Sequence, residues 1–330
     1  MGDKQGPDRN LALELVRVTE AAALAAARWQ GRGDKESGDQ AAVDAMRVML
    51  STVSMDGVVV IGEGEKDEAP MLYNGEEIGT GEPPQTDIAV DPVEGTTLLA
   101  EGRTGAISVI ALAPRDTMFD PGPAMYMEKI VVGPEVGDVV HLDASVGENL
   151  QAIARATGRE VREVTVAMLE RDRHDDLKRQ IREAGARLTL FDHGDVAAGV
   201  QAAWEERRDV DVLMGIGGTP EGVIGACATK ALGGRMFGRL WPRSDEEREA
   251  LTDQGYDLDQ VLTTDDLVAS EDVFFVCTGI TSGGLVGGVS FDGRGVTTES
   301  VVMRSKSGTI RTVRARHSLE KMREYASSDF

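Results

Sequence analysis

The sequence predicts an α/β protein with two lobes, and three observations support this fold class. The chain has 330 residues, of which 41% are hydrophobic, enough for a large core and more than one simple domain requires. From Val164 onward, apolar segments alternate between strand and helix periodicity, which is typical of βαβ units around a largely parallel sheet. Earlier in the chain, short β-branched runs end in acidic turns. We therefore expect an α+β lobe over residues 1–145 and an αβα lobe over residues 146–330.

The composition limits the classes of function. A formal net charge of -22 argues against nucleic acid or an anionic membrane as a partner, because both would be repelled. No long apolar run and no signal-peptide core occurs, so we expect a cytoplasmic protein. The two cysteines, Cys227 and Cys277, lie in an expected helix and an expected strand, where a buried thiol is a commoner role than a disulfide or a metal ligand.

The first elements are two helices and a strand. Leu11–Trp29 has apolar residues at helical spacing. Asp39 stands where the N-cap of the next helix is expected, and there it could cap the helix, bind a metal, or do both. The strand Val58–Ile61 runs into an acidic loop, which is either solvated or delivers Glu63 to a site at the strand tip. Glycines on both sides of Glu63 favour the second interpretation.

The central stretch, Thr86–Thr97, is predicted to be a buried strand that leads into an acidic turn and a helix start. Ile88–Val90 supplies the apolar run, and Pro92 is expected to end the strand just after Asp91. Glu94 then adds a second carboxylate, followed by a glycine and two possible capping threonines. Such a turn can hold divalent cations through its carboxylates and a phosphate through backbone N–H groups. It can equally be an ordinary turn with a solvated carboxylate.

A third acidic strand end is expected at Gly215–Gly222. The glycine spacing does not fit a dinucleotide fingerprint. Glu221 begins the next helix, where it could simply interact with the helix dipole or serve as a metal ligand. If the strands ending at Ile61 and Val90 are neighbours, Glu63 lies near Asp91 and Glu94, because ligands bind at the carboxyl ends of such strands.

Several segments together resemble the bacterial class II fructose-1,6-bisphosphatases, in the lithium-sensitive phosphatase superfamily that includes inositol monophosphatases. The likeness runs from about Glu20 to about Leu319. It implies a layered α-β-α-β-α sandwich and hydrolysis of fructose 1,6-bisphosphate to fructose 6-phosphate and phosphate, a gluconeogenic step. The segments that carry the resemblance are Gly31–Lys35, Ile61–Glu65, Asp67–Tyr73, Asp91–Thr96, Met125–Lys129 and Gly215–Gly222.

The resemblance implies a two-metal site, most of whose ligands come from the first lobe. Two or more Mg²⁺ or Mn²⁺ ions would activate water and offset charge on the leaving oxygen. Thr96 would orient the water, Asp67 would accept its proton, and Lys35 would contact a phosphate. An all-oxygen ligand set suits hard cations and argues against structural zinc. The implied metal ligands are Asp39, Glu63, Asp91, Glu94 and Glu221.

Sugar and phosphate recognition is implied to come mainly from the second lobe. Arg171 and Arg173 offer forked donors for the far phosphate. The family usually has Asp-Gly-Asp where this chain has His193-Gly194-Asp195, so His193 could donate to the substrate or Asp192 could take over. The full implied substrate set is Glu94, Gly95, Thr96, Tyr126, Arg171, Asp172, Arg173, His193, Asp195 and Gly218.

Other functions remain open on the sequence alone. The same metal site could serve a sedoheptulose-1,7-bisphosphatase or an inositol or nucleotide phosphatase. A noncatalytic alternative is an acidic, metal-dependent binding module. The resemblance also implies a homo-oligomer, either a dimer or a tetramer.

Overall fold

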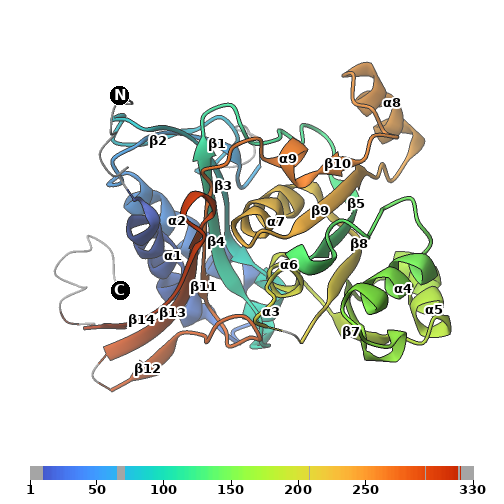
Figure 1. The fold of residues 1–330 in the computed structure, drawn as a ribbon. Coiled ribbons are helices and arrows are strands. Elements are labelled where there is room, and N and C mark those ends of the chain that lie inside the picture. Colours follow the sequence, from blue (N-terminus) through green and yellow to red (C-terminus); the bar gives the residue numbers. More distant parts are fainter. Residues whose placement is uncertain (1–9, 65–70, 208, 294, 319, 321–330) are drawn as a thin grey trace, which may run out of the picture.

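Two β-sheets and the helices that cover them make up the protein (Figure 1). The computed structural model describes residues 10–64, 71–207, 209–293, 295–318 and 320. Six helices pack on the sheets: α1 (Ala12–Ala26), α2 (Lys35–Leu50), α4 (Val146–Ala156), α5 (Asp175–Glu183), α6 (Val196–Ala203) and α7 (Thr219–Ala231). Shorter helices lie in the connections: α3 (Thr96–Glu101), α8 (Asp245–Asp253) and α9 (Thr264–Leu267).

The first sheet, sheet 1, has the strand order β12-β13-β11-β4-β3-β1-β2, and β14 pairs with β13. Its only parallel pairing among the described residues joins β1 to β3. The strands are β1 (Asp56–Ile61), β2 (Glu77–Gly79), β3 (Gln85–Glu94), β4 (Ile107–Pro114), β11 (Phe274–Gly279), β12 (Ser290–Asp292), β13 (Gly295–Arg304) and β14 (Thr309–His317).

The second sheet, sheet 2, has the strand order β10-β9-β5-β8-β6-β7. Strands β7, β6 and β8 run parallel, as the alternating pattern predicted, but the remaining pairings are antiparallel. The prediction of a largely parallel sheet is therefore wrong, because β5 comes from earlier in the chain and lies between β8 and β9. The strands are β5 (Tyr126–Val132), β6 (Thr165–Leu169), β7 (Arg187–Phe191), β8 (Val212–Gly218), β9 (Arg235–Leu240) and β10 (Leu262–Thr263).

Three hydrophobic clusters hold the layers together. The first packs α1 and α2 on sheet 1 and includes the fully buried Leu15 and Met46. The second lies between the sheets around α6 and α7 and includes Val223. The third packs α4 and α5 on the outer face of sheet 2, where Ile153 and Ile181 are buried. The layer order is therefore α-β-α-β-α (Figure 1), which confirms the predicted fold class.

The chain passes between the sheets more than once. Strand β5 precedes residue 145 yet belongs to sheet 2, and β11 to β14 follow it yet belong to sheet 1. The division into lobes at residue 145 stays a prediction, and the assignment of strands to sheets does not follow it.

Two local predictions near the site are corrected. Asp34, not Asp39, caps α2, since its Oδ1 accepts a hydrogen bond from the Ser37 N–H at 3.0 Å. Asp39 lies inside the helix instead. Pro92 does not end β3, which continues to Glu94 through an irregularity in its pairing with β4. The strand tolerates proline there because the irregularity interrupts the regular ladder.

The cysteines are buried and unpaired, as predicted. Cys227 lies in α7 and Cys277 in β11. Burial raises the pKa of each thiol to about 12, so neither is a ready nucleophile. Among the described residues, no helix has the length and apolar character needed to cross a membrane.

Candidate active site

The site begins where β1 and β3 end side by side. The two strands pair in parallel, with Val59 opposite Ile88. Their carboxyl ends therefore lie side by side at the same end of the sheet. This confirms the predicted neighbourhood of the two acidic turns. The Glu63 N–H donates to the Leu72 carbonyl at 2.9 Å, which fixes the backbone at the β1 tip. A Cβ on Gly62 would lie 1.9 Å from that carbonyl oxygen, so only glycine fits there.

Glu94 connects the end of β3 in sheet 1 to helix α6. It is 4% exposed, and its Oε1 accepts a hydrogen bond from the Val196 N–H at the start of α6 at 3.2 Å. Gly95 follows with φ of 94° and precedes α3, so the predicted threonine cap is replaced by a glycine in the left-handed region. Thr96 is the first residue of α3 instead.

The β8–α7 junction brings the third acidic side chain. Gly218 precedes α7, and Glu221 lies in its first turn. The Glu221 carboxylate folds over Gly218, where a Cβ would lie 1.8 Å from its Oε2. The glycine thus makes room for the acid.

A cavity of about 500 Å³ collects most of the predicted residues. Two predicted residues, Lys35 and Asp172, do not line it, and Asp67 lies outside the described residues. Lys35 nevertheless begins α2 near the cavity, since its charge helps to lower the pKa of His193. The predicted residues that line it are Asp39, Glu63, Asp91, Glu94, Gly95, Thr96, Tyr126, Arg171, Arg173, His193, Asp195, Gly218 and Glu221.

The carboxylates of Glu63, Asp91, Glu94 and Glu221, called here the floor of the cavity, repel one another. Burial, followed by repulsion from Asp39, raises the pKa of Glu63 to about 7. Burial and the charges of Glu221 and Asp195 raise the pKa of Glu94 to about 7. The pKa of Asp91 is also raised well above its ordinary value, by burial and then by Glu94. These shifts mean that the ionised floor is unfavourable unless cations stabilise it.

The donor set fits hard divalent cations, although the side chains do not form a finished coordination shell. Across the described ranges, no three His, Cys, Asp or Glu side chains are arranged closely enough to hold an ion as they stand. The observation that supports a metal is the convergence on one cavity of oxygen donors, each with a raised pKa, from α2, the turn after β1, β3 and α7.

Nearly the whole chain matches one known protein family. Residues 9–317 match the family described as bacterial fructose-1,6-bisphosphatase, glpX-encoded. The chain belongs to this family. Relatives from Escherichia coli strain K12, E. coli O6:H1 and Shigella flexneri, each a class 2 fructose-1,6-bisphosphatase, are 44% identical over 326 residues, covering 95% of this chain and 96% of theirs. Membership confirms the resemblance and the predicted enzyme class.

Solved structures show weaker similarity. An extragenic suppressor protein, suhB, from Bartonella henselae is 16% identical with a TM-score of 0.35, over 60% of this chain and 74% of that chain. An extragenic suppressor from Pyrococcus furiosus is 12% identical with a TM-score of 0.30, over 57% and 68% of the two chains.

In this member of the fructose-1,6-bisphosphatase family, Lys129 contacts a site residue. The sequence did not lead us to expect a role for Lys129 in the site. It lies on β5 and is 2% exposed. Its Nζ is 2.7 Å from Asp195 Oδ2 and donates to the Gly218 carbonyl at 2.9 Å. A lysine inside the apolar strand Tyr126–Val132 was the available signal, because a buried ammonium needs an acidic partner.

Two guanidinium groups lie over the ring of Tyr126, which lines the cavity. The Arg173 guanidinium carbon lies 5.1 Å from the centre of the Tyr126 ring. Arg243, which the sequence analysis also missed, lies 5.2 Å from the same ring. Both distances are within the range of cation–π attraction.

The unusual His193 and its neighbour Asp192 have different surroundings. His193 lines both the main cavity and an adjoining cavity of about 320 Å³, whereas Asp192 lines only the adjoining one and forms an ion pair with Arg103. Burial, then Arg171 and Lys35, lower the pKa of His193, which favours a neutral ring near pH 7. Of the two, His193 is therefore the one placed to face a substrate.

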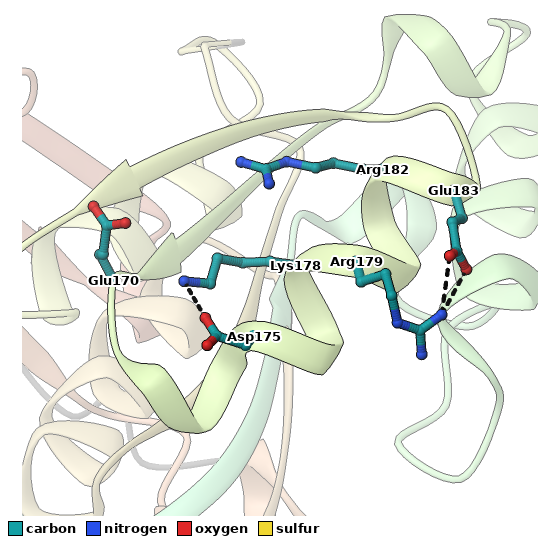
Figure 2. A pocket seen from close by; sticks show the side chains of 6 residues that line it. All are labelled: Glu170, Asp175, Lys178, Arg179, Arg182 and Glu183. Atoms are coloured by element: carbon teal, nitrogen blue, oxygen red, sulfur yellow. Dashed lines mark hydrogen bonds and ion pairs between the residues drawn. The ribbon is translucent and has the colours of Figure 1, made fainter.

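Another hollow, of about 510 Å³, lies over α5, and none of the predicted site residues lines it (Figure 2). Its charged side chains largely neutralise one another. Lys178 pairs with Asp175 at 2.6 Å, and Arg179 pairs with Glu183 at 2.9 Å. It lacks the buried acidic floor that marks the candidate active site.

Proposed function

We propose that this chain hydrolyses fructose 1,6-bisphosphate to fructose 6-phosphate and phosphate at the 500 Å³ cavity. The observation that carries the proposal is that acidic groups and arginines line the same cavity. The acidic groups come from three strand ends, and the guanidinium groups are those of Arg171 and Arg173. A substrate with two phosphates suits this arrangement, since one can meet cations at the floor and the other the arginines.

The proposed cofactor is two or more Mg²⁺ or Mn²⁺ ions. They would be held by Asp39, Glu63, Asp91, Glu94 and Glu221. When bound, such ions supply positive charge for both the attacking and the leaving oxygen. The chain itself contributes the anchoring of each carboxylate, such as the hydrogen bond from the Val93 N–H to Asp91 Oδ1 at 3.0 Å.

Further groups would orient the substrate and the water. We assign the Thr96 hydroxyl to the attacking water, and the Tyr126 hydroxyl and Asp195 to sugar hydroxyls. Lys129 supports this role because its Nζ, 2.7 Å from Asp195 Oδ2, fixes the position of that carboxylate. Lys35 as a phosphate contact and Asp67 as proton acceptor rest on the family resemblance alone. We also propose a homo-oligomer, on the family resemblance, and a cytoplasmic location, on the sequence pattern described above.

Turnover of a panel of phosphate esters tests the proposal. The esters are fructose 1,6-bisphosphate, sedoheptulose 1,7-bisphosphate, an inositol monophosphate and a nucleoside monophosphate, each with Mg²⁺, with Mn²⁺ and with excess EDTA. We expect the highest kcat/KM for fructose 1,6-bisphosphate and none with EDTA.

Two results would contradict it. If the bisphosphate is hydrolysed no faster than the monophosphates, the substrate assignment is wrong. If Asp91→Asn has the same low activity as the unmodified chain, the protein is instead a noncatalytic metal-binding module.

A further inference from the structure

His174 is a buried histidine that directly follows Arg173 in the turn between β6 and α5. It is 1% exposed, although histidine is usually found at least partly in contact with water. Its ring lies between two strands of sheet 2. Nδ1 is 2.7 Å from the Leu169 carbonyl at the end of β6, and Nε2 is 2.8 Å from the Ile216 nitrogen on β8.

These contacts define one neutral tautomer. A backbone carbonyl only accepts, so Nδ1 must carry the hydrogen and donate to Leu169. A backbone N–H only donates, so Nε2 must be the acceptor from Ile216. Burial, together with the charges of Arg173 and Lys178, lowers the pKa of His174, which agrees with a neutral ring.

The same residue of β8 also holds the neighbouring arginine. The Ile216 carbonyl accepts from Arg173 Nε at 3.2 Å and from Nη2 at 2.8 Å. His174 therefore fixes Ile216 through its N–H, and Ile216 fixes the Arg173 guanidinium through its carbonyl. Gly215 permits this approach, since it has φ of 140° and a Cβ there would lie 3.1 Å from the His174 ring.

We propose that His174 is a positioning residue for the far phosphate of the substrate. It never touches the substrate, but it holds the Ile216 backbone that fixes the Arg173 guanidinium at the cavity. This inference rests on the proposed function, because it gives Arg173 the phosphate contact. An arginine with several rotatable bonds loses much conformational entropy on binding unless its position is fixed beforehand.

Two near-isosteric variants separate the two hydrogen bonds of the ring. In His174→Gln the amide oxygen can take the place of Nε2 and accept from Ile216. In His174→Asn the amide nitrogen can take the place of Nδ1 and donate to Leu169, but nothing reaches Ile216. We expect His174→Asn to raise KM for fructose 1,6-bisphosphate on the order of tenfold, with kcat within about twofold, and His174→Gln to leave both nearly unchanged.

The comparison with Arg173→Ala shows whether the effect passes through the arginine. In the Arg173→Ala background, His174→Asn should add less than about twofold to KM, because the group that it positions is gone. Hydrolysis of p-nitrophenyl phosphate, which has no far phosphate, should be unaffected by His174→Asn. His317→Gln, at the distant end of β14, is the control and should leave the kinetics with both substrates unchanged.

Three outcomes would overturn the inference. They are an unchanged KM in His174→Asn, an equal rise in His174→Gln and His174→Asn, or full additivity with Arg173→Ala. A failure of the proposed function looks different, since the unmodified chain would then not hydrolyse fructose 1,6-bisphosphate at all. Thermal melting of each variant establishes that it is folded before kinetics are compared, and if His174→Asn does not fold, the inference fails because the residue is then structural.

Discussion

At the scale of single residues, the site concentrates carboxylates that destabilise one another. Glu63 and Glu94 have pKa values raised to about 7 by burial and by neighbouring acids, from an ordinary value of 4.5. Between pH 4.5 and about pH 7, these groups lose their protons in the unfolded chain but keep them in the folded chain. In the metal-free protein, these groups therefore lower the free energy of unfolding as pH rises from 4.5 through 7.

We predict that Glu63→Gln makes the metal-free protein less sensitive to pH in this window. The variant removes one of the groups whose ionisation opposes folding, so its free energy of unfolding should fall less between about pH 5 and about pH 8 than that of the unmodified chain. Denaturant unfolding after EDTA treatment measures this. Glu101→Gln, on the exposed end of α3, is the control and should keep the original slope. An unchanged slope in Glu63→Gln would contradict the account of the floor.

Single residues also show how far the sequence could predict the site. Glu63 and Glu221 were placed correctly at strand ends because glycine and β-branched patterns mark where a strand stops. Asp39 was misplaced, because Asp34 and Asp39 are both acceptable caps and only the packed helix shows which is used. Lys129 and Arg243 were missed because their partners, Asp195 and Tyr126, are distant in sequence.

At the scale of elements, the junction between β8 and α7 carries the most specific requirement. Gly218 has no side chain where Glu221 folds back, whereas Gly225, further along α7, has open space around its Cβ position. A side chain at position 218 would therefore clash with Glu221, whereas position 225 has room for one.

Substituting both glycines tests this difference. Gly218→Ala should displace the Glu221 carboxylate and lower kcat/KM on the order of tenfold or more, while leaving the chain folded, because the flexible acid can move aside. Gly225→Ala should keep full activity and stabilise the protein by about 0.5–1 kcal/mol, since alanine is favoured in helix interiors. Steady-state kinetics and thermal unfolding measure both. Equal activity in the two variants would show that the Glu221 position does not matter.

Prediction of the elements succeeded where it depended on local patterns. The parallel strands β6, β7 and β8 followed from alternating periodicity between Val164 and Ile216. The antiparallel half of sheet 2 could not be predicted, because it depends on where β5 inserts rather than on any local preference. Pro92 likewise looked like a strand end, yet the pairing of β3 with β4 continues beyond it to Glu94.

At the scale of the whole molecule, the fold brings together side chains from distant parts of the chain. Sheet 1 supplies Glu63, Asp91 and Glu94, and the helix after β8 of sheet 2 supplies Glu221. The second hydrophobic cluster, between the sheets, fixes their relative position. In a protein of net charge -22, bound cations would offset the charge where an anionic substrate must approach.

Titration of the metal-free protein with Mn²⁺, followed by electron paramagnetic resonance, tests this convergence most directly. Asp91 lies between acids from different elements, so Asp91→Asn should weaken more than one ligand contact. The account predicts two or more Mn²⁺ per unmodified chain, and in Asp91→Asn the loss of at least one ion or a fall in affinity of about tenfold or more. Binding of the same number of ions with the same affinity by both proteins would contradict it.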